Sequence, residues 1–223
     1  NKYEALYLDR LLITQAPAIA LGNAKKELVH LASYAIQSLE ASYAFFDKGD
    51  EKYFDKVEKY ETAVNSIDEE LTTYLIDISN ESLSVSENEV LASVLDSVRD
   101  LERIGDLAVA SANLSQHIHN KGIEFSETAK TELGDVYNRT HRIVLDSIRV
   151  VVDDDKVLAG QVILRHEELE KLEKQLRKTH TKRLNNGECT AQAGINYVDY
   201  LSHYTRIADH AINLVEKVTE GVI

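Results

Sequence analysis

The amino-acid sequence predicts an all-α protein built as two tandem three-helix bundles related by pseudo-twofold symmetry. Three observations favour this fold class. The 223-residue chain contains one proline and nine glycines, too few turn-forming residues for the many tight turns of a β protein. Apolar residues recur with helical periodicity over long stretches. A short motif also occurs twice, about half a chain apart, as LERIGDLA at residues 101–108 and as YTRIADHA at residues 204–211.

The first half is expected to contain three long helices after an N-terminal segment at residues 1–17. Pro17 fits the first turn of a helix that runs to about Phe46, because proline is preorganised for that position. A second helix is predicted from about Glu51 to Ile78. The third helix opens with Ser86 to Glu89, which has the S-x-x-E pattern of a capping box, and it should continue to about His119. The first repeat is therefore placed at residues 18–122.

The second half repeats this plan at residues 123–223. Predicted helices cover about 126–152 and 156–184, separated by the acidic break at 153–155, and a last helix ends near Val218. The sequence Asn-Asn-Gly at residues 185–187 is a strong helix stop. Because long helices with short connections pack as antiparallel neighbours, each half is expected to form an up-down bundle.

The composition excludes several classes of protein. The formal charge of −13 argues against nucleic acid as a partner, since phosphate binding needs clustered Lys and Arg. A single cysteine, Cys189, excludes an internal disulfide framework. No apolar run of about 18 residues is present, so no membrane span is expected. The chain begins at Asn1 and has no methionine, which is expected either of a portion of a longer protein or of a sequence from which modified methionines are omitted.

The first copy of the motif carries a pair of carboxylates. Glu102 and Asp106 are four residues apart, so on a helix they share one face about 5–6 Å apart between Cβ atoms. Such a pair repels itself unless a cation is near. That cation is either an arginine of the same helix, Arg99 or Arg103, or a divalent metal ion, for which clustered oxygens are suitable ligands. A hydrated ladder of surface charges is the simpler interpretation.

The second copy lies on a helix with one apolar and one polar face. The apolar face is formed by Val198, Leu201, Tyr204, Ala208, Ala211, Ile212 and Val215. The polar stripe contains Asp199, His203, Arg206, His210 and Asn213, with Asp209 at its border. Asp209 matches Asp106 of the first copy, but Thr205 stands where that copy has Glu102. A second complete acidic cluster therefore requires substitutes, for which Asp199, His203 and His210 are the nearby candidates.

These motifs carry a resemblance to a known family. The segments DLERIGDLA and YTRIADHAINLVEKV are similar to the duplicated signature of the PhoU family, which has an acidic residue, three others and Asp. The approach to the last helix, NNGECTAQAGINYVDYL, extends the similarity. The N-terminal segment YLDRLLITQAPAIALGNAKKELVHLA also resembles the join that precedes the PhoU-like region of bacterial sodium/phosphate cotransporter-family proteins.

The resemblance implies a PhoU-like, non-enzymatic regulator of phosphate transport or phosphate signalling. It further implies divalent or iron-type metal ions on the acidic motifs. The ligands expected are Glu102, Asp106, Asp209 and Asp199, with Arg103, Arg206 and His210 as supporting motif residues. The implied partner is a set of membrane transporter helices, in the same polypeptide, which places the domain in the cytoplasm at the inner face of the cell membrane. Self-association is left open.

Two alternatives compete with this interpretation. A metal-free helical adaptor would explain why Thr205 and Ala110 depart from the motif. A carboxylate-bridged di-iron enzyme needs a Glu-x-x-His pair on each of two helices, and only Glu27 with His30 has this spacing. No glycine-rich loop opens a helix, and no nucleophile, base and orienting group stand at recognisable spacing. The chain is therefore predicted not to be an enzyme.

Overall fold

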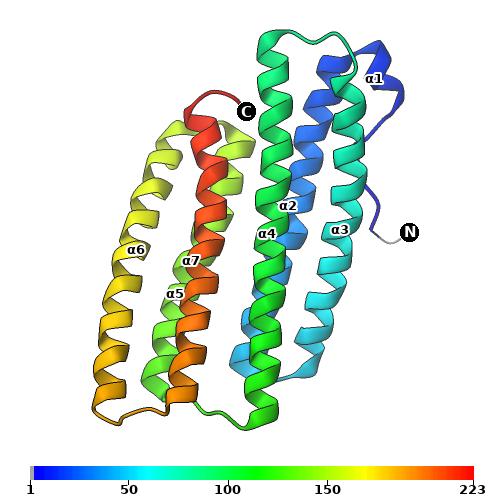
Figure 1. The fold of residues 1–223 in the computed structure, drawn as a ribbon. Helices are drawn as coiled ribbons and strands as arrows, with labels where there is room; N and C mark the ends of the chain where they lie inside the picture. Colours follow the sequence, from blue (N-terminus) through cyan, green and yellow to red (C-terminus); the bar gives the residue numbers. More distant parts are fainter. Residues whose placement is uncertain (1–2) are drawn as a thin grey trace.

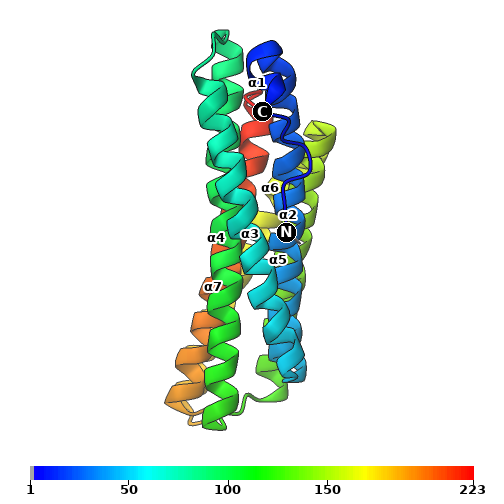
Figure 2. The same ribbon diagram turned by 90° about the vertical axis from the view of Figure 1, so that its right-hand side faces the viewer.

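The computed structural model describes residues 3–223 and contains seven helices and no strand in that range. Their bounds are α1 (Leu11–Gln15), α2 (Pro17–Lys48), α3 (Glu51–Ser79), α4 (Val85–Lys121), α5 (Glu127–Asp153), α6 (Lys156–Asn185) and α7 (Ala191–Thr219). Helices α2–α4 form one up-down bundle and α5–α7 form another beside it (Figure 1). Both bundles run along the same long axis, as the perpendicular view shows (Figure 2). The all-α prediction is confirmed.

The helix ends follow local capping chemistry. The first helix of the N-terminal bundle starts at Pro17, and Gly49 closes it in the left-handed conformation, with φ of 69°. The capping box of α4 lies two residues earlier than predicted. The Ser84 hydroxyl accepts a hydrogen bond from the Glu87 amide at 3.1 Å, while the Glu87 carboxylate accepts one from the Ser84 amide at 2.9 Å. The assignment to Ser86 and Glu89 is therefore wrong.

One continuous apolar core joins the two bundles. It contains buried side chains from every long helix, so the halves are not separated by solvent. At the contact of α2 with α5, the rings of Tyr43 and Tyr137 stack with centroids 4.0 Å apart. Tyr200 and Tyr204 of α7 pack nearby and are almost completely buried. This shared core fixes α4 and α7, which carry the two motifs, next to each other (Figure 1).

Within the N-terminal segment, the sequence predicts a short amphipathic stretch from Lys2 to Leu12, and the structure differs from this prediction. Residues 1 and 2 lie outside the described residues, and residues 3–10 form no helix. The five-residue α1 begins only at Leu11. Over residues 3–223, none of the helices combines the length and apolar character needed to cross a bilayer.

Candidate metal centre

The first motif faces a matching row of carboxylates on the neighbouring helix α3. Glu102 and Asp106 project from α4, and Glu61 and Asp68 project from α3. The carboxyl groups come together as two pairs, Glu61 with Asp106 and Asp68 with Glu102. Because ionised carboxylates are acceptors only, each pair can hydrogen-bond only through a shared proton. The α3–α4 contact is thus an acidic centre, called here the first acidic site.

Glu61 lies deepest in this site. Its Oε2 atom is buried and has no hydrogen-bond donor. It approaches α4 closely at Gly105, where an added Cβ would lie 3.2 Å from that oxygen. Since Gly105 stands between the two motif carboxylates, its missing side chain makes room for the third. A buried oxygen without a donor, paired with one other carboxylate, is suited to contact a cation, although no three side chains of this site bring ligand atoms within 4.8 Å of one another among the described residues.

Burial and mutual repulsion shift the acidity of this site. Burial and the neighbouring Asp106 carboxylate raise the pKa of Glu61 from 4.5 to about 7. Burial and Asp68 likewise raise the pKa of Glu102. Arg103 lies 3.8 Å from Asp106, but its side chain is 68% exposed, so this ion pair is largely screened by water. The arginines of α4 therefore leave part of the repulsion uncompensated.

Asp209 is the aspartate of the second motif copy, at the position of Asp106 in the first. It lies in a smaller cluster of side chains from α6 and α7, called here the second acidic site. His166 Nε2 is 2.7 Å from Asp209 Oδ1, and His166 Nδ1 is 3.1 Å from Glu170 Oε1. Within residues 3–223, only these three residues bring potential ligand atoms from three side chains within 4.8 Å of one another. The hydrogen bond to Asp209 raises the pKa of His166.

The two sites are related by the repeat but differ in chemistry. His166 and Glu173 stand 105 residues after Glu61 and Asp68. Glu173 is paired with Arg177 at 2.7 Å, and that guanidinium also donates to Ser202 at 2.8 Å. Glu173 corresponds to Asp68 of the first site. Its negative charge is neutralised by Arg177, whereas Asp68 is paired with the carboxyl group of Glu102. The buried Thr205, which lacks a carboxylate, lies on the same stretch of α7.

The structure does not bring the proposed substitutes to Asp209. Asp199 is exposed and lies outside the cluster of Asp209. The ring of His203 hydrogen-bonds Ser111 at 3.0 Å, and the ring of His210 hydrogen-bonds Asp100 at 3.0 Å. Arg206 is also exposed. The expectation that Asp199, His203 or His210 completes a second cluster is corrected: the neighbours of Asp209 come from α6.

The histidines of α7 instead belong to a polar ladder that joins α7 to α4. Asp100 accepts from His210 and from Asn213, both at 3.0 Å. About three turns further along α4, Ser111 meets His203, and one turn beyond it Ser115 meets the Tyr200 hydroxyl at 2.6 Å. Burial lowers the pKa of His203, which favours its neutral form in this contact. The ladder fixes the register of the two motif helices.

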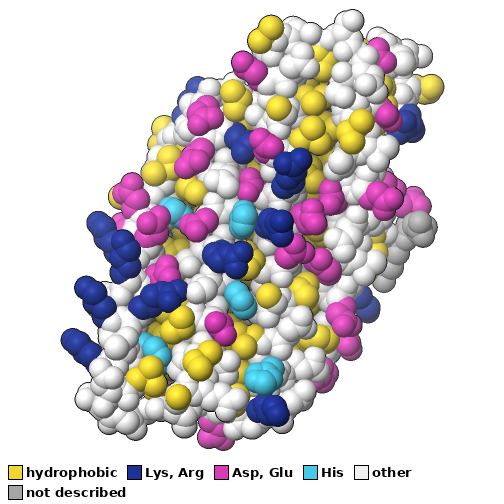
Figure 3. Space-filling model, in the orientation of Figure 1, with side chains coloured by type: hydrophobic (Ala, Val, Ile, Leu, Met, Phe, Trp, Pro, Cys, Tyr) yellow, Lys and Arg dark blue, Asp and Glu magenta, His cyan; other side chains and the backbone are white. Residues whose placement is uncertain are grey.

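The surface over these helices carries mixed charge. Acidic and basic side chains alternate on the face formed by α4, α6 and α7, with histidines among them (Figure 3). This face therefore differs from the continuous basic patch that a nucleic-acid backbone requires.

Sequence reasoning found the motif residues but missed their partners. Glu61 and Asp68 belong to no motif and, in the sequence, lie on the polar side of the predicted helix from Glu51 to Ile78. His166 and Glu170 carried a usable signal, because they are four residues apart on one helix and repeat the position of Glu61.

Comparison with known proteins resolves the family. The family model described as the PhoU domain matches residues 28–114 and 133–218, one match in each half. The chain belongs to the PhoU family. A relative from Thermotoga maritima, named phosphate-specific transport system accessory protein PhoU homolog 1, is 30% identical over 128 residues. The matched stretch spans 57% of this chain and 54% of that relative, so about half the length of the relative is covered.

Two solved structures share the fold. PhoU from Pseudomonas aeruginosa superposes with a TM-score of 0.81 at 20% identity, covering 90% of this chain and 97% of that one. The phosphate transport system regulatory protein PhoU from Streptococcus pneumoniae gives 0.80 at 15% identity, with coverage of 91% and 95%. At these identities the likeness establishes the two-bundle PhoU fold.

Proposed function

We propose that this PhoU-family chain is a non-enzymatic regulator of phosphate transport whose two acidic sites bind metal ions. The observation that carries the proposal is the duplicated PhoU match, one over each bundle, with motif carboxylates on the last helix of each, α4 and α7. The names of the relatives, an accessory protein and a regulatory protein of phosphate transport systems, support the role. The di-iron alternative has no support, because Glu27 and His30 are bonded to each other at 2.6 Å and serve another contact.

The two sites suit different ions. The first acidic site offers only oxygens, which favours hard cations such as Mg²⁺ or Mn²⁺ and accommodates iron. The second site adds an imidazole nitrogen to two carboxylates, a ligand set suited to Zn²⁺ or Fe²⁺. A bound cation would offset the burial and the repulsion by Asp106 that raise the pKa of Glu61, so binding at the first site would release a proton near pH 7.

The proposed partner is a membrane phosphate transporter, and the proposed location is the cytoplasmic face of the cell membrane. The resemblance of the N-terminal segment to the join in sodium/phosphate cotransporter-family proteins supports a transporter in the same polypeptide. In this proposal, the metal state of the bundles favours one docked arrangement over another. The affinity for metal and the affinity for the transporter would then depend on each other.

Metal content and phosphate uptake test the proposal together. Metal is measured by plasma mass spectrometry after dialysis without chelator, for the unmodified chain and for Glu102→Ala/Asp106→Ala. The exposed α4 residue Asp96 provides the control, Asp96→Ala. We expect stoichiometric metal in the unmodified and control chains, about one equivalent fewer in the double variant, and altered phosphate uptake only where metal is lost.

A metal-free adaptor is the second candidate, and one observation favours it. Arg177 supplies at the second site a positive charge that a cation would otherwise provide. If no chain retains metal and the double variant still regulates uptake normally, the adaptor replaces the metal-linked regulator.

A further inference from the structure

Residues 3–10, called here the strap, are fixed to the bundle through a fully buried carboxylate on α2. Glu27 has 0% exposure. Its Oε1 atom accepts hydrogen bonds from two successive backbone amides, those of Leu6 at 2.6 Å and Tyr7 at 2.9 Å. Its Oε2 atom is 2.6 Å from His30 Nδ1. Among residues 3–223, the hydrogen-bond partners of this carboxylate are thus two strap amides and one histidine.

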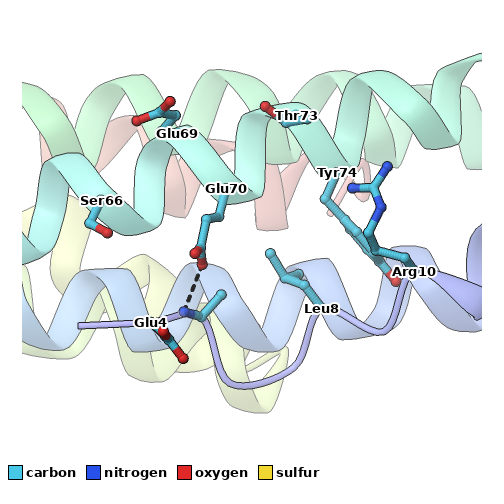
Figure 4. Close-up of a pocket in the computed structure, with 9 residues that line it drawn as sticks. Glu4, Leu8, Arg10, Ser66, Glu69, Glu70, Thr73 and Tyr74 are labelled. Carbon is cyan, nitrogen blue, oxygen red and sulfur yellow. Dashed lines mark hydrogen bonds between the residues drawn. The ribbon is translucent and has the colours of Figure 1, made fainter. Parts of the chain in front are cut away.

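Contacts to α3 also involve the strap backbone. The Ala5 amide donates to Glu70 at 2.8 Å, the bond drawn in Figure 4, and the Tyr74 hydroxyl donates to the carbonyl of Asp9 at 3.0 Å. Between these points the strap stands away from α3 and leaves a pocket of about 600 Å³. The strap therefore bridges α2 and α3 at a few points and does not fill the space between them.

At the centre of the strap, the backbone makes the contact and the side chains of the two bonded residues do not. Leu6 is 65% exposed and Tyr7 is 41% exposed, so the two residues whose amides bind Glu27 turn their side chains to solvent. Leu8 packs against the core as a partly buried hydrophobic residue. Near the two ends of the strap, the Tyr3 ring meets the Tyr34 ring of α2 edge to face with centroids 5.7 Å apart, and the Arg10 guanidinium pairs with Asp77 of α3. The α2–α3 surface thus recognises an extended backbone at the centre of the strap, with an apolar anchor at Leu8 and side-chain contacts near both ends.

Among the described residues, the helices supply the buried Glu27 carboxylate with one hydrogen-bond partner, His30. An ionised carboxylate removed from water costs several kcal/mol unless donors compensate it. Without the strap, His30 alone would remain as a hydrogen-bond partner of Glu27 in the part of the chain that the structure describes. The α2–α3 surface is therefore complete only when two adjacent amide groups of an extended segment occupy it.

We propose that this α2–α3 surface is a peptide-binding site, occupied in cis by the strap and able to exchange it for an extended segment of another polypeptide. The ligand class is an unstructured segment that offers two successive free N–H groups followed by an apolar residue. Recognition resembles strand addition in that main-chain groups supply the bonds, but the receptor here is a helix pair. The inference goes beyond the proposed function, because it uses neither acidic site.

The test releases the strap without altering its binding surface. The full chain carrying Leu6→Pro/Tyr7→Pro lacks both amide donors, since proline has no N–H. The matched control, Leu6→Ala/Tyr7→Ala, keeps both amides and removes only exposed side chains. The probe is a fluorescent synthetic peptide with the sequence of residues 3–12, and binding is followed by fluorescence anisotropy.

We expect the proline variant to bind the peptide at least about tenfold more tightly than the unmodified chain or the alanine control, because a tethered occupant competes at high effective concentration. Adding Glu27→Leu to the proline variant should abolish binding. Equal binding by all chains, no binding by the proline variant, or binding that survives Glu27→Leu would overturn the proposal.

A second measurement covers the case in which the proline variant fails to fold. Hydrogen exchange of the unmodified chain should show protected amides at Leu6 and Tyr7 that open more readily than the core of the bundle. In the peptide-site proposal, adding the strap peptide in large excess accelerates exchange at these two amides. Acceleration supports the proposal, and unchanged exchange refutes it. Neither experiment involves metal, so its outcome is independent of the proposed regulatory role.

Discussion

Glu61→Gln provides the most direct test of the repulsion within the first acidic site. The substitution keeps the shape of the side chain and removes its titration. In the folded chain the pKa of Glu61 is about 7, compared with 4.5 for the free side chain. Folding therefore favours the neutral form. Its stabilising contribution is fully present below pH 4.5 and is lost as the pH rises through 7.

The size of the effect follows from this difference in pKa. A rise from 4.5 to about 7 corresponds to at most about 3.4 kcal/mol at alkaline pH. Glu61 retains partial contact with solvent, which screens the interaction, so we expect about 1–2 kcal/mol. The glutamine variant should thus match the unmodified chain near pH 4.5 and exceed its free energy of unfolding by this amount at pH 8.

The assay is urea denaturation followed by circular dichroism, in the presence of chelator, at pH 5, 6.5 and 8. Glu58→Gln, an exposed change one turn earlier on α3, is the control and should show no such divergence. A glutamine variant that is no more stable than the unmodified chain at pH 8 would refute the assignment of Glu61 as a repelled, half-buried acid. Without chelator, added Mn²⁺ should stabilise the unmodified chain more than the variant.

Three further predictions concern other parts of the fold. Asp209→Asn should lower the pKa of His166, because the carboxylate that stabilises the protonated imidazole is lost. NMR titration of the imidazole measures this pKa, and an unchanged midpoint would contradict the contact between His166 and Asp209. Gly194→Ala should lower the free energy of unfolding by about 1–3 kcal/mol, because the new Cβ would lie 2.8 Å from the buried ring of His180. Thermal or chemical denaturation measures this, and an unchanged stability would mean that the ring moves aside without cost. Asp100→Ala should cost about 1–3 kcal/mol by leaving two α7 donors without their acceptor, and a change below about 0.5 kcal/mol would show that water replaces it.

The helices could be predicted from the sequence because their ends are encoded locally. Pro17, Gly49 and Gly122 punctuate the first bundle by backbone geometry alone, and the structure places helix ends at each. The error at the start of α4 arose because two serines, Ser84 and Ser86, both precede a glutamate by three residues. Only the hydrogen bonds distinguish them.

The candidate site was less predictable because its pairs join different helices. Glu102 and Asp106 were visible as a spaced motif, but their pairing with α3 depends on how two helices pack. Asp199 was misplaced for a geometric reason. It precedes Asp209 by ten residues, about 15 Å along a helix and nearly a quarter turn away, so both cannot contact one ion.

The role of Glu27 was also hidden from the sequence. Its spacing from His30 suggested half of a di-iron motif, and no local pattern indicates that a segment 20 residues earlier supplies its donors. Contacts of this kind depend on the path of a nonhelical chain, which periodicity does not describe.

The polar ladder between α4 and α7 determines which parts of the molecule are free to respond. Its bonds at Asp100, Ser111 and Ser115 would all have to break if one helix slid by a turn along the other. The pair of helices α4 and α7 is therefore held in a fixed register. The outer helices α3 and α6 contact this pair across carboxylates that repel or are only partly neutralised, so the α3–α4 and α6–α7 contacts depend on charge in a way that the α4–α7 contact does not. The strap bonds to α3 as well as to α2, which places it against one of these charge-dependent helices.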